Sequence, residues 1–352
     1  MKCIRCHGDC KYPERSDGRC PYCKGEFAFE PRTGAPITDT GFKTAIDAVS
    51  SMGTVRFLPD HVYYEIARRK RSRGVARNAL YGLGAAGLLL ALANPIGLLL
   101  ASFGAVTGTL LWPTSEAKLS RLAFDELWKR WIKVHGEPAG LIKRSQRAPA
   151  TPYRGPTDIP SYSFDRAVIC DRPQTVDVLL ANNFHFENNC AVLSVDGYPP
   201  HAFDTVRQML TNNPRLVVYV LHDATYTGCN LAYRLASDPK WFRGRARVVE
   251  VGLRPAHARK LRGVWQPPDL TTAGSGGTTE LERRWLERHS LELASIRPEQ
   301  VVKRLYAVIV AEAALVHASQ YVDVEPGVDY YVHPGSFQRE AKAADGGVDS
   351  FG

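Results

Sequence analysis

The stretch Ala167-Val168-Ile169-Cys170-Asp171-Arg172-Pro173 decides the fold of the C-terminal half, because a short apolar run ends at an acid and gives way to a helical pattern over 173–183. The alternation recurs three times, with apolar runs at 191–195, 216–221 and 246–251 that precede helical patterns at 201–212, 228–237 and 255–261. Short strands separated by helices are typical of a parallel sheet with right-handed crossovers. The sequence therefore predicts a four-stranded parallel α/β domain over 161–262.

Acidic residues close two of these predicted strands. Asp171 follows the first strand and Asp223 follows the third. Because the carboxyl ends of parallel strands meet at one edge of a sheet, where ligands gather, we expect both side chains to face one site. Two carboxylates in such a place are suited to a hard divalent cation joined to a phosphate. Asp171 and Asp223 are therefore the candidate catalytic and magnesium-binding residues.

The residues around these acids resemble a Toprim domain, and the resemblance covers roughly 165–262. The run 168–173 and the later strand that ends in Ser194-Val195-Asp196-Gly197 resemble the first half of that domain. The run Val218-Tyr219-Val220-Leu221-His222-Asp223-Ala224-Thr225-Tyr226-Thr227-Gly228 resembles its strand ending in Asp-x-Asp-x-x-Gly. The resemblance implies a Rossmann-like sheet in which Asp171 stands for the family glutamate, a general acid or base, and Asp223 for the first metal-binding aspartate. Thr225 stands where the second aspartate would be, and Arg172 stands where a glycine is usual.

The resemblance implies two alternative functions. A threonine hydroxyl cannot supply the charge of the missing aspartate, so we expect a catalytically silent module that binds nucleic acid or a protein partner. The alternative is an active magnesium-dependent nuclease or topoisomerase-like enzyme that uses Asp171 and Asp223, with Glu292 as a third acid if the chain folds back. His222 either titrates near neutral pH or is a hydrogen-bonded structural residue.

A second similarity lies after the predicted sheet. The run Leu291-Glu292-Leu293-Ala294-Ser295-Ile296-Arg297-Pro298 is similar to the stretch that follows the Toprim core in topoisomerase VI A subunits. That family pairs a winged-helix tyrosine with the Toprim metal, so the similarity implies a tyrosine nucleophile, for which Tyr63 and Tyr64 are the comparable positions. A tyrosine pair on a helix is also a common packing feature, and both interpretations stay open.

Five of the eight cysteines fall within the first 23 residues, a distribution that argues against a disulfide scaffold. The motifs Cys3-x-x-Cys6 and Cys20-x-x-Cys23 each offer two thiolates from one short loop, and this spacing is typical of a zinc ribbon. We predict structural zinc held by these four residues in a ribbon over 1–30. Two alternatives remain: the string Cys3-Ile4-Arg5-Cys6-His7 matches a haem c attachment site, and His7 or Cys10 could replace one ligand. No signal peptide precedes the cluster, so we expect it to stay in a reducing compartment.

The net charge of +9 is unevenly placed, since residues 1–150 hold 23 basic and 13 acidic side chains. A helix–strand–helix pattern predicts a small winged-helix-like unit over 40–77, whose last helix carries six cations between Arg68 and Arg77. Such a run is either a solvated helix face or a contact for phosphate, whether of lipid or of nucleic acid.

The segment 78–115 has no charged side chain over 38 residues. We predict that it forms a membrane helical hairpin turning at Asn94-Pro95, because cations flank it on both sides and the positive-inside rule then places both ends in the cytoplasm. One long kinked span and a buried helical hairpin are the alternatives. The amphipathic helix predicted over 116–135 either lies at the membrane interface or packs on a neighbouring domain.

The remaining segments are a proline-rich linker over 136–160, a flexible connector over 263–278 and a helical C-terminal extension with a polar tail over 279–352. A hydrophobic content of 44% excludes a mainly disordered or collagen-like chain. The predicted architecture is therefore multidomain: a zinc ribbon, a membrane hairpin and a Toprim-like α/β domain. We expect a membrane-anchored, cytoplasm-facing protein whose partners are anionic lipid and, in addition, nucleic acid or another protein.

Overall fold

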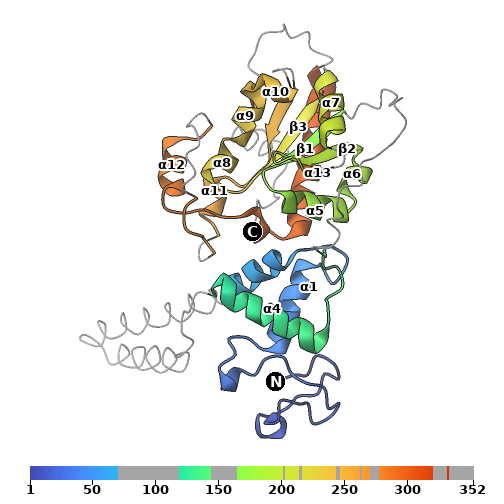
Figure 1. The fold of residues 1–352 in the computed structure, drawn as a ribbon, viewed down its shortest axis with the longest axis vertical. Coiled ribbons are helices and arrows are strands. Elements are labelled where there is room, and N and C mark those ends of the chain that lie inside the picture. The colour runs from blue at the N-terminus through green and yellow to red at the C-terminus, as the bar shows by residue number, and fades with distance from the viewer. Residues whose placement is uncertain are drawn as a thin grey trace, which may run out of the picture. The chain divides into compact units, whose positions relative to one another are not determined.

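The computed structural model of the protein describes residues 1–69, 119–143, 165–200, 203–213, 216–242, 246–261, 264–269, 277–319 and 331–332 (Figure 1). The chain divides into two compact units. One unit comprises Met1–Ile46 and Val62–Pro138, and the other comprises Asp47–His61 and Ala139–Gly352.

The larger unit is built on a parallel sheet. Its strands are β1 (Arg166–Cys170), β2 (Cys190–Ser194), β3 (Val217–Leu221) and β4 (Arg247–Glu250), in the spatial order β2-β1-β3-β4. The two-residue strand β5 (Tyr331–Val332) pairs in parallel with β4. Cys170 is in register with Ser194 on one side and with Leu221 on the other, so the carboxyl ends of three strands lie level. The predicted four-stranded parallel sheet is confirmed, and it places residues 171 and 222–223 at one edge.

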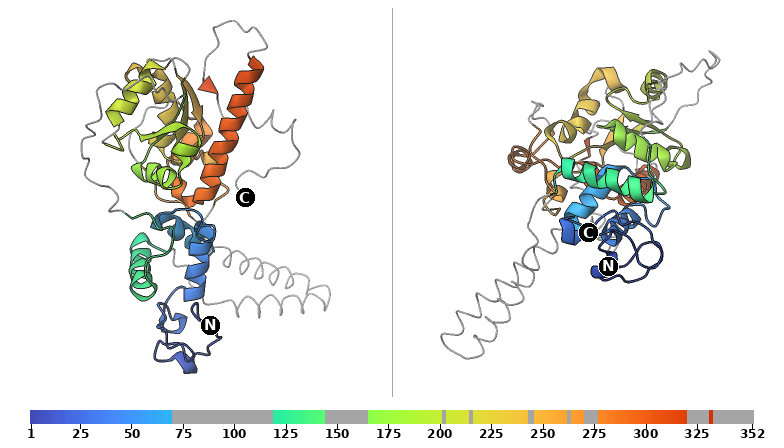
Figure 2. Two further views of the ribbon diagram at one scale, coloured as in Figure 1. Left: turned by 90° about the vertical axis from the view of Figure 1, so that its right-hand side faces the viewer. Right: turned by 60° about the horizontal axis from the view of Figure 1, so that its bottom comes forward.

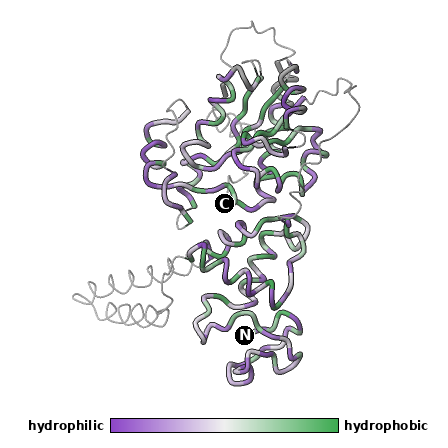
Figure 3. The backbone as a smooth tube through the Cα atoms, in the orientation of Figure 1, coloured by the Kyte–Doolittle hydropathy of each residue, from purple (hydrophilic) through white to green (hydrophobic). Residues whose placement is uncertain are grey.

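Both faces of this sheet are covered, as expected for strands that are apolar on both sides. Figure 3 shows the hydrophobic strands at the centre of the unit, and Figure 2 shows α7 and α13 on opposite sides of the sheet. On one face Ile169, Leu193 and Val218 form a buried cluster with Leu235 and Phe242. The helices of this unit are α5 (Pro173–Ala181), α6 (Phe184–Glu187), α7 (Phe203–Asn212), α8 (Tyr226–Cys229), α9 (Leu231–Ser237), α10 (Pro239–Phe242), α11 (Pro255–Ala258), α12 (Glu280–Leu286), the 3-10 turn η4 (Leu293–Ser295) and α13 (Pro298–Ser319).

A segment from the N-terminal half packs on this sheet domain. The backbone N–H of Arg56 donates a 2.8 Å hydrogen bond to the side-chain oxygen of Asn182, and the Asn182 amide donates back to the Arg56 carbonyl at 3.0 Å. Ser51 also hydrogen-bonds to Glu299 at the start of α13. These contacts place residues 58–61 at the carboxyl end of the sheet. A helix begins there, at residue 59.

The smaller unit combines the cysteine-rich N-terminus with helices α1 (Asp39–Val49) and α4 (Arg121–His135). The carboxylate of Asp39 is fully buried and accepts hydrogen bonds from the backbone N–H groups of Ala28 and Phe29, at 3.0 and 2.7 Å. Nε2 of His135 lies 2.7 Å from the same carboxylate. Trp131 of α4 stacks on Phe42 of α1 with ring centroids 4.8 Å apart. The apolar face of α4 is therefore a packing face within this unit.

The predicted fold class and the predicted membrane localisation require correction. Across the described ranges, none of the helices combines the length and the apolar character that crossing a membrane requires. Helix α13 has sufficient length, at 22 residues, but it contains Glu299, Lys303, Arg304 and Glu312, which are costly in a bilayer. What is present is the parallel sheet with its helices and the cysteine-rich unit.

Several predicted segments lie wholly or partly outside the described residues. They are the hairpin 78–115, the cations after residue 69, the linker from residue 144 onward, the connector 270–276 and the tail beyond residue 319 apart from β5.

Candidate functional site

Four cysteines at the N-terminus converge on one point. Sγ of Cys3 lies 3.7 Å from Sγ of Cys23, and Sγ of Cys6 lies 3.6 Å from Sγ of Cys20. All four sulfur atoms lie within 4.8 Å of one another. Thiolates bound tetrahedrally at about 2.3 Å from zinc are about 3.8 Å apart, so the cluster could hold a metal ion such as zinc.

The two metal loops are related by a pseudo-twofold repeat of 17 positions along the chain. In the first loop the N–H of Cys3 donates to the carbonyl of Gly8 at 2.9 Å, and in the second the N–H of Cys20 donates to that of Gly25 at 2.9 Å. His7 and Lys24, the residues before these glycines, both have a left-handed backbone, with φ of 60° and 59°. The sequence repeat therefore produces two equivalent turns that face each other across the sulfur atoms.

Each loop also packs on the glycine of the other. A Cβ atom on Gly8 would lie 2.5 Å from the ring of Tyr22, and one on Gly25 would lie 2.9 Å from the side chain of Arg5. Tyr22 and Arg5 hold corresponding third positions of the two CxxC motifs. A side chain at either glycine would displace the residue that packs on it from the other loop, a role that the motif spacing alone did not indicate.

Cys10 lies outside the group of four. Its sulfur atom is 3.7 Å from that of Cys20, but it is not among the four mutually close ligand atoms. The repeat relates Cys10 to Phe27, and both side chains belong to one buried cluster. Burial raises the pKa of the Cys10 thiol to about 11, whereas the backbone N–H of Cys23 lowers the pKa of Cys20 to about 6. Cys10 therefore lies in the buried cluster beside the four candidate ligands.

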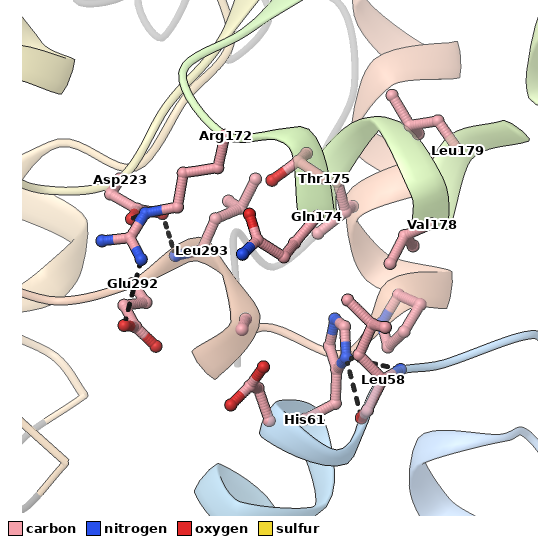
Figure 4. A pocket seen from close by; sticks show the side chains of 14 residues that line it. Leu58, His61, Arg172, Gln174, Thr175, Val178, Leu179, Asp223, Glu292 and Leu293 are labelled. Atoms are coloured by element: carbon pink, nitrogen blue, oxygen red, sulfur yellow. Dashed lines mark hydrogen bonds and ion pairs between the residues drawn. The ribbon is translucent and has the colours of Figure 1, made fainter. Parts of the chain in front are cut away.

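Asp171 and Asp223, the two acids predicted at the sheet edge, are in contact. The backbone N–H of Asp223 donates a 2.7 Å hydrogen bond to Oδ2 of Asp171, and Oδ1 of Asp223 accepts a 2.6 Å hydrogen bond from the N–H of Leu293 (Figure 4). Asp223 is only 1% exposed. The chain does fold back as the third-acid hypothesis required, because η4 brings Glu292 to the same edge.

Arg172 lies between these acids. Its Nε atom forms an ion pair with Oδ2 of Asp223, and its Nη1 atom lies 3.3 Å from Oε1 of Glu292. The guanidinium thus neutralises the carboxylates that a divalent cation would need. Sequence reasoning treated Arg172 only as a departure from the family pattern. Its position directly after the first strand was the signal that it could reach both acids.

Burial controls the protonation of the acid pair. It raises the pKa of Asp171, and the hydrogen bond from Asp223 only partly opposes the rise. The pKa of Asp223 is raised well above its usual range by burial and by the charge of Asp171, against the opposing charge of Arg172. Folding therefore favours a proton on this pair.

Thr225 and Gly228 form the turn that follows Asp223. Oγ1 of Thr225 accepts a 3.0 Å hydrogen bond from the N–H of Gly228 and caps helix α8. A Cβ atom on Gly228 would lie 2.4 Å from the carbonyl oxygen of Asp223 and 3.2 Å from Oδ2 of Asp171. The Thr225 hydroxyl thus caps a helix by accepting a backbone hydrogen bond, and the absence of a side chain at Gly228 allows α8 to lie close to Asp171 and Asp223.

His222 has a structural position beside the site. Its Nδ1 atom lies 2.8 Å from the Asp223 carbonyl and its Nε2 atom 2.7 Å from Oε1 of Glu250. Arg254 lies 3.0 Å from the same Glu250 oxygen, and all three side chains are buried. Hydrogen bonds to Cys229 and to the Glu250 carboxylate outweigh burial and raise the pKa of His222 well above its usual range. His222 is therefore an imidazolium held between two acceptors.

The tyrosine pair of the N-terminal half is packed. The hydroxyl of Tyr63 donates to the carbonyl of Leu119 at 3.2 Å, and Arg121 donates to the hydroxyl of Tyr64 at 3.2 Å. The Arg121 guanidinium also lies 4.2 Å from the centroid of the Tyr63 ring. Both tyrosines are buried, with 6% and 0% of their surface exposed.

Within the described part of the chain, the four cysteines are the only group of three or more ligating side chains close enough to hold a metal ion. Asp171, Asp223 and Glu292 do not form such a group. In comparisons with protein-family models, with curated proteins and with solved structures, no match to this chain is found.

Proposed function

We propose that this protein is a zinc-stabilised nucleic-acid-binding protein whose Toprim-like α/β domain is catalytically silent. The observation that carries the proposal is the pair of contacts from Arg172 to Asp223 and to Glu292. A magnesium ion is generally held by one or two carboxylates and by substrate phosphates. Here the carboxylates are already paired with a cation of the protein itself.

The side-chain oxygens around these Arg172 contacts, which we call the Arg172 clamp, support a silent site as well, because they already accept hydrogen bonds. Oδ1 of Asp223 is engaged by the Leu293 N–H, Oδ2 of Asp171 by the Asp223 N–H, and the Thr225 hydroxyl by the Gly228 N–H. Binding a divalent ion would require breaking the ion pair of buried Asp223 with the more exposed Arg172, together with one or more of these hydrogen bonds. Such a rearrangement is costly because each buried group would lose its partner.

Zinc is the metal we assign to the cysteine cluster. Four thiolates with tetrahedral edge lengths suit zinc, and the closed set leaves no open position for a substrate, so the role is structural. Exposed cations that could contact phosphate lie both on the ribbon and on α4, interspersed with exposed acids such as Asp17, Glu26 and Asp125. The exposed cations are Lys2, Arg5, Lys11, Arg19, Lys24, Lys129, Arg130 and Lys133.

The proposal is tested by titrating the full chain into labelled single- and double-stranded oligonucleotides at several salt concentrations, with fluorescence anisotropy as the readout. We expect binding that weakens steeply as salt rises, because counterions are released when phosphates are neutralised. No binding at low salt would overturn the nucleic-acid assignment. Nicking of plasmid DNA with Mg²⁺ or Mn²⁺, lost in Asp223→Ala, would overturn the silent-site assignment.

A second candidate is an active metal-dependent phosphodiester enzyme. The raised pKa values of Asp171 and Asp223 favour it, because perturbed carboxyl pairs cluster at active sites. The discriminating variant is Arg172→Ala, with Arg207→Ala on α7 as the matched control. Nicking by Arg172→Ala alone would identify Arg172 as the group that silences an otherwise competent acid pair, whereas inertness of both variants with Mg²⁺ supports a module without catalysis.

A further inference from the structure

A hollow opens beside the Arg172 clamp, within the larger compact unit. Apolar side chains from three different parts of the chain line it, among them Leu58, Val178, Leu179 and Leu293 (Figure 4). Hollows of this kind, with apolar walls and a few convergent polar groups, are the usual form of a small-molecule site.

His61 supplies the first of these polar groups. Its ring is only 6% exposed, and its Nδ1 atom accepts a 3.2 Å hydrogen bond from the backbone N–H of Leu58. Nδ1 also lies 3.3 Å from the Leu58 carbonyl, and burial lowers the pKa of His61 to about 4, so the ring is neutral at pH 7. Figure 4 shows the second ring nitrogen, Nε2, directed away from Leu58 into the hollow, and within the described ranges nothing hydrogen-bonds to it.

Gln174 supplies the second polar group of the hollow. It stands in the first turn of α5, and Figure 4 shows its amide directed into the same space as the His61 ring. Among the residues that the structure describes, this amide has no hydrogen-bond partner. A carboxamide presents a donor beside an acceptor, so its natural complement is a ligand edge that carries an N–H group beside a C=O group.

The charges around the hollow disfavour an anion. Asp60, Asp223 and Glu292 line it, against the single guanidinium of Arg172. A phosphate or carboxylate would meet this acidic wall, and the two polar groups that face the hollow, His61 and Gln174, are both uncharged. The chemistry therefore selects a neutral ligand that forms hydrogen bonds along one edge and buries apolar faces.

We propose that this hollow binds a small uncharged molecule with a lactam edge, of which a pyrimidine base is the type. The Gln174 amide pairs with the N–H and C=O groups of that edge, Nε2 of His61 hydrogen-bonds to a further polar group of the ligand, and the apolar walls cover the ring. The site goes beyond the proposed function, because a base can arrive as a free nucleoside or as part of a single strand.

Calorimetric titration of the full chain distinguishes these sources. The ligands are uridine, N3-methyluridine, uridine monophosphate and a short oligothymidylate. We expect uridine to bind and N3-methyluridine to bind at least about tenfold more weakly, because methylation removes the N–H and leaves the Gln174 acceptor unpaired. Uridine monophosphate should bind no more tightly than uridine. Binding of the oligonucleotide alone would mean that the base is read within a strand.

The protein variants are Gln174→Leu and, as matched control, Gln208→Leu on the exposed face of α7. Because Gln174 is partly exposed, the variant should keep the thermal unfolding profile of the wild type. We expect it to lose about tenfold or more in uridine affinity while Gln208→Leu loses none.

Two results would overturn the site: no binding of uridine or of the oligonucleotide, or equal affinity in Gln174→Leu and wild type. Tighter binding of the monophosphate would overturn the uncharged ligand class. The calorimetry is run at high salt, where phosphate contacts are weak. A chain that binds neither uridine nor the oligothymidylate there, yet binds oligonucleotides at low salt, would fail this proposal and keep the proposed function, so the two proposals fail separately.

Discussion

The backbone N–H of Asp223 donates a 2.7 Å hydrogen bond to Oδ2 of Asp171, so two carboxyl groups from adjacent strands are held at one edge of the sheet. Asp223 is almost fully buried, and Arg172 is the cation in direct contact with it. The same arrangement controls the protonation of the pair, its response to metal and its contribution to stability.

The acid pair should make the protein less stable as pH rises. The folded pKa of Asp171 is raised above the unfolded value of 3.8, so its favourable contribution is fully present below pH 3.8 and is lost as pH rises through the folded pKa. Asp171→Asn keeps an acceptor for the Asp223 N–H without the charge. We expect this variant to have a higher free energy of unfolding than wild type at pH 7 and a flatter pH profile in urea denaturation. A lower free energy of unfolding for Asp171→Asn than for wild type at pH 7 would contradict the view that a charge on Asp171 is unfavourable in the folded protein.

The buried triad of His222, Glu250 and Arg254 should be costly to break. Glu250→Gln leaves two buried cations without their shared carboxylate, and such losses reduce the free energy of unfolding by about 3–5 kcal/mol. The matched control is Glu126→Gln, which removes an exposed pair with Lys129 and should cost about 0.5 kcal/mol or less. Denaturant titration of both variants measures the difference, and equal effects would show that the triad is not a stabilising unit.

The same triad gives a second pH dependence. The pKa of His222 is raised above its unfolded value of 6.5, so the stabilisation is fully present below pH 6.5 and is lost as pH rises through the folded pKa. We expect the free energy of unfolding to fall with pH above neutrality in wild type and to fall less steeply in His222→Gln. Identical slopes would mean that His222 is not charged in the folded protein.

The cysteine cluster should bind one metal ion per chain. Cys20→Ser removes a ligand and should abolish stoichiometric zinc binding, whereas Cys10→Ser should retain it, because Cys10 is a core residue beside the cluster. Elemental analysis of both purified variants checks this, and circular dichroism after chelation should show loss of structure only where metal had been bound. Loss of zinc in Cys10→Ser would place the fifth cysteine among the ligands.

Gly228 should tolerate no side chain. A Cβ atom there would lie 2.4 Å from the carbonyl oxygen of Asp223, so backbone must move, and we expect Gly228→Ala to lower the free energy of unfolding by about 1–3 kcal/mol. The change should also shift the chemical shifts of the Asp171 and Asp223 carboxyl carbons. An unperturbed variant would show that α8 can move away from the acids at no cost.

The sequence by itself determined the features that depend on near neighbours along the chain. Apolar runs that alternate with helical patterns require parallel strands joined by crossovers, and the register of Cys170 with Leu221 then brings Asp171 and Asp223 together. Likewise, two CxxC motifs place paired thiolates on one side of a short turn, whatever surrounds them. The membrane hairpin was predicted from an uncharged run and its flanking cations, and no helix in the described ranges bears out a membrane span.

Only the tertiary structure decided the state of the sheet-edge site. Arg172 and Glu292 are 120 positions apart, and Ser51 meets Glu299 across 248 positions, so neither contact leaves a periodic signal in the sequence. Whether an acid pair holds a cation, a proton or a guanidinium depends on which side chains the returning chain brings within about 4 Å, where Coulomb interactions in a poorly solvated site are strongest. The strand order placed the two aspartates, and the path of the chain from Glu292 to Pro298 supplied the partner that completes the clamp.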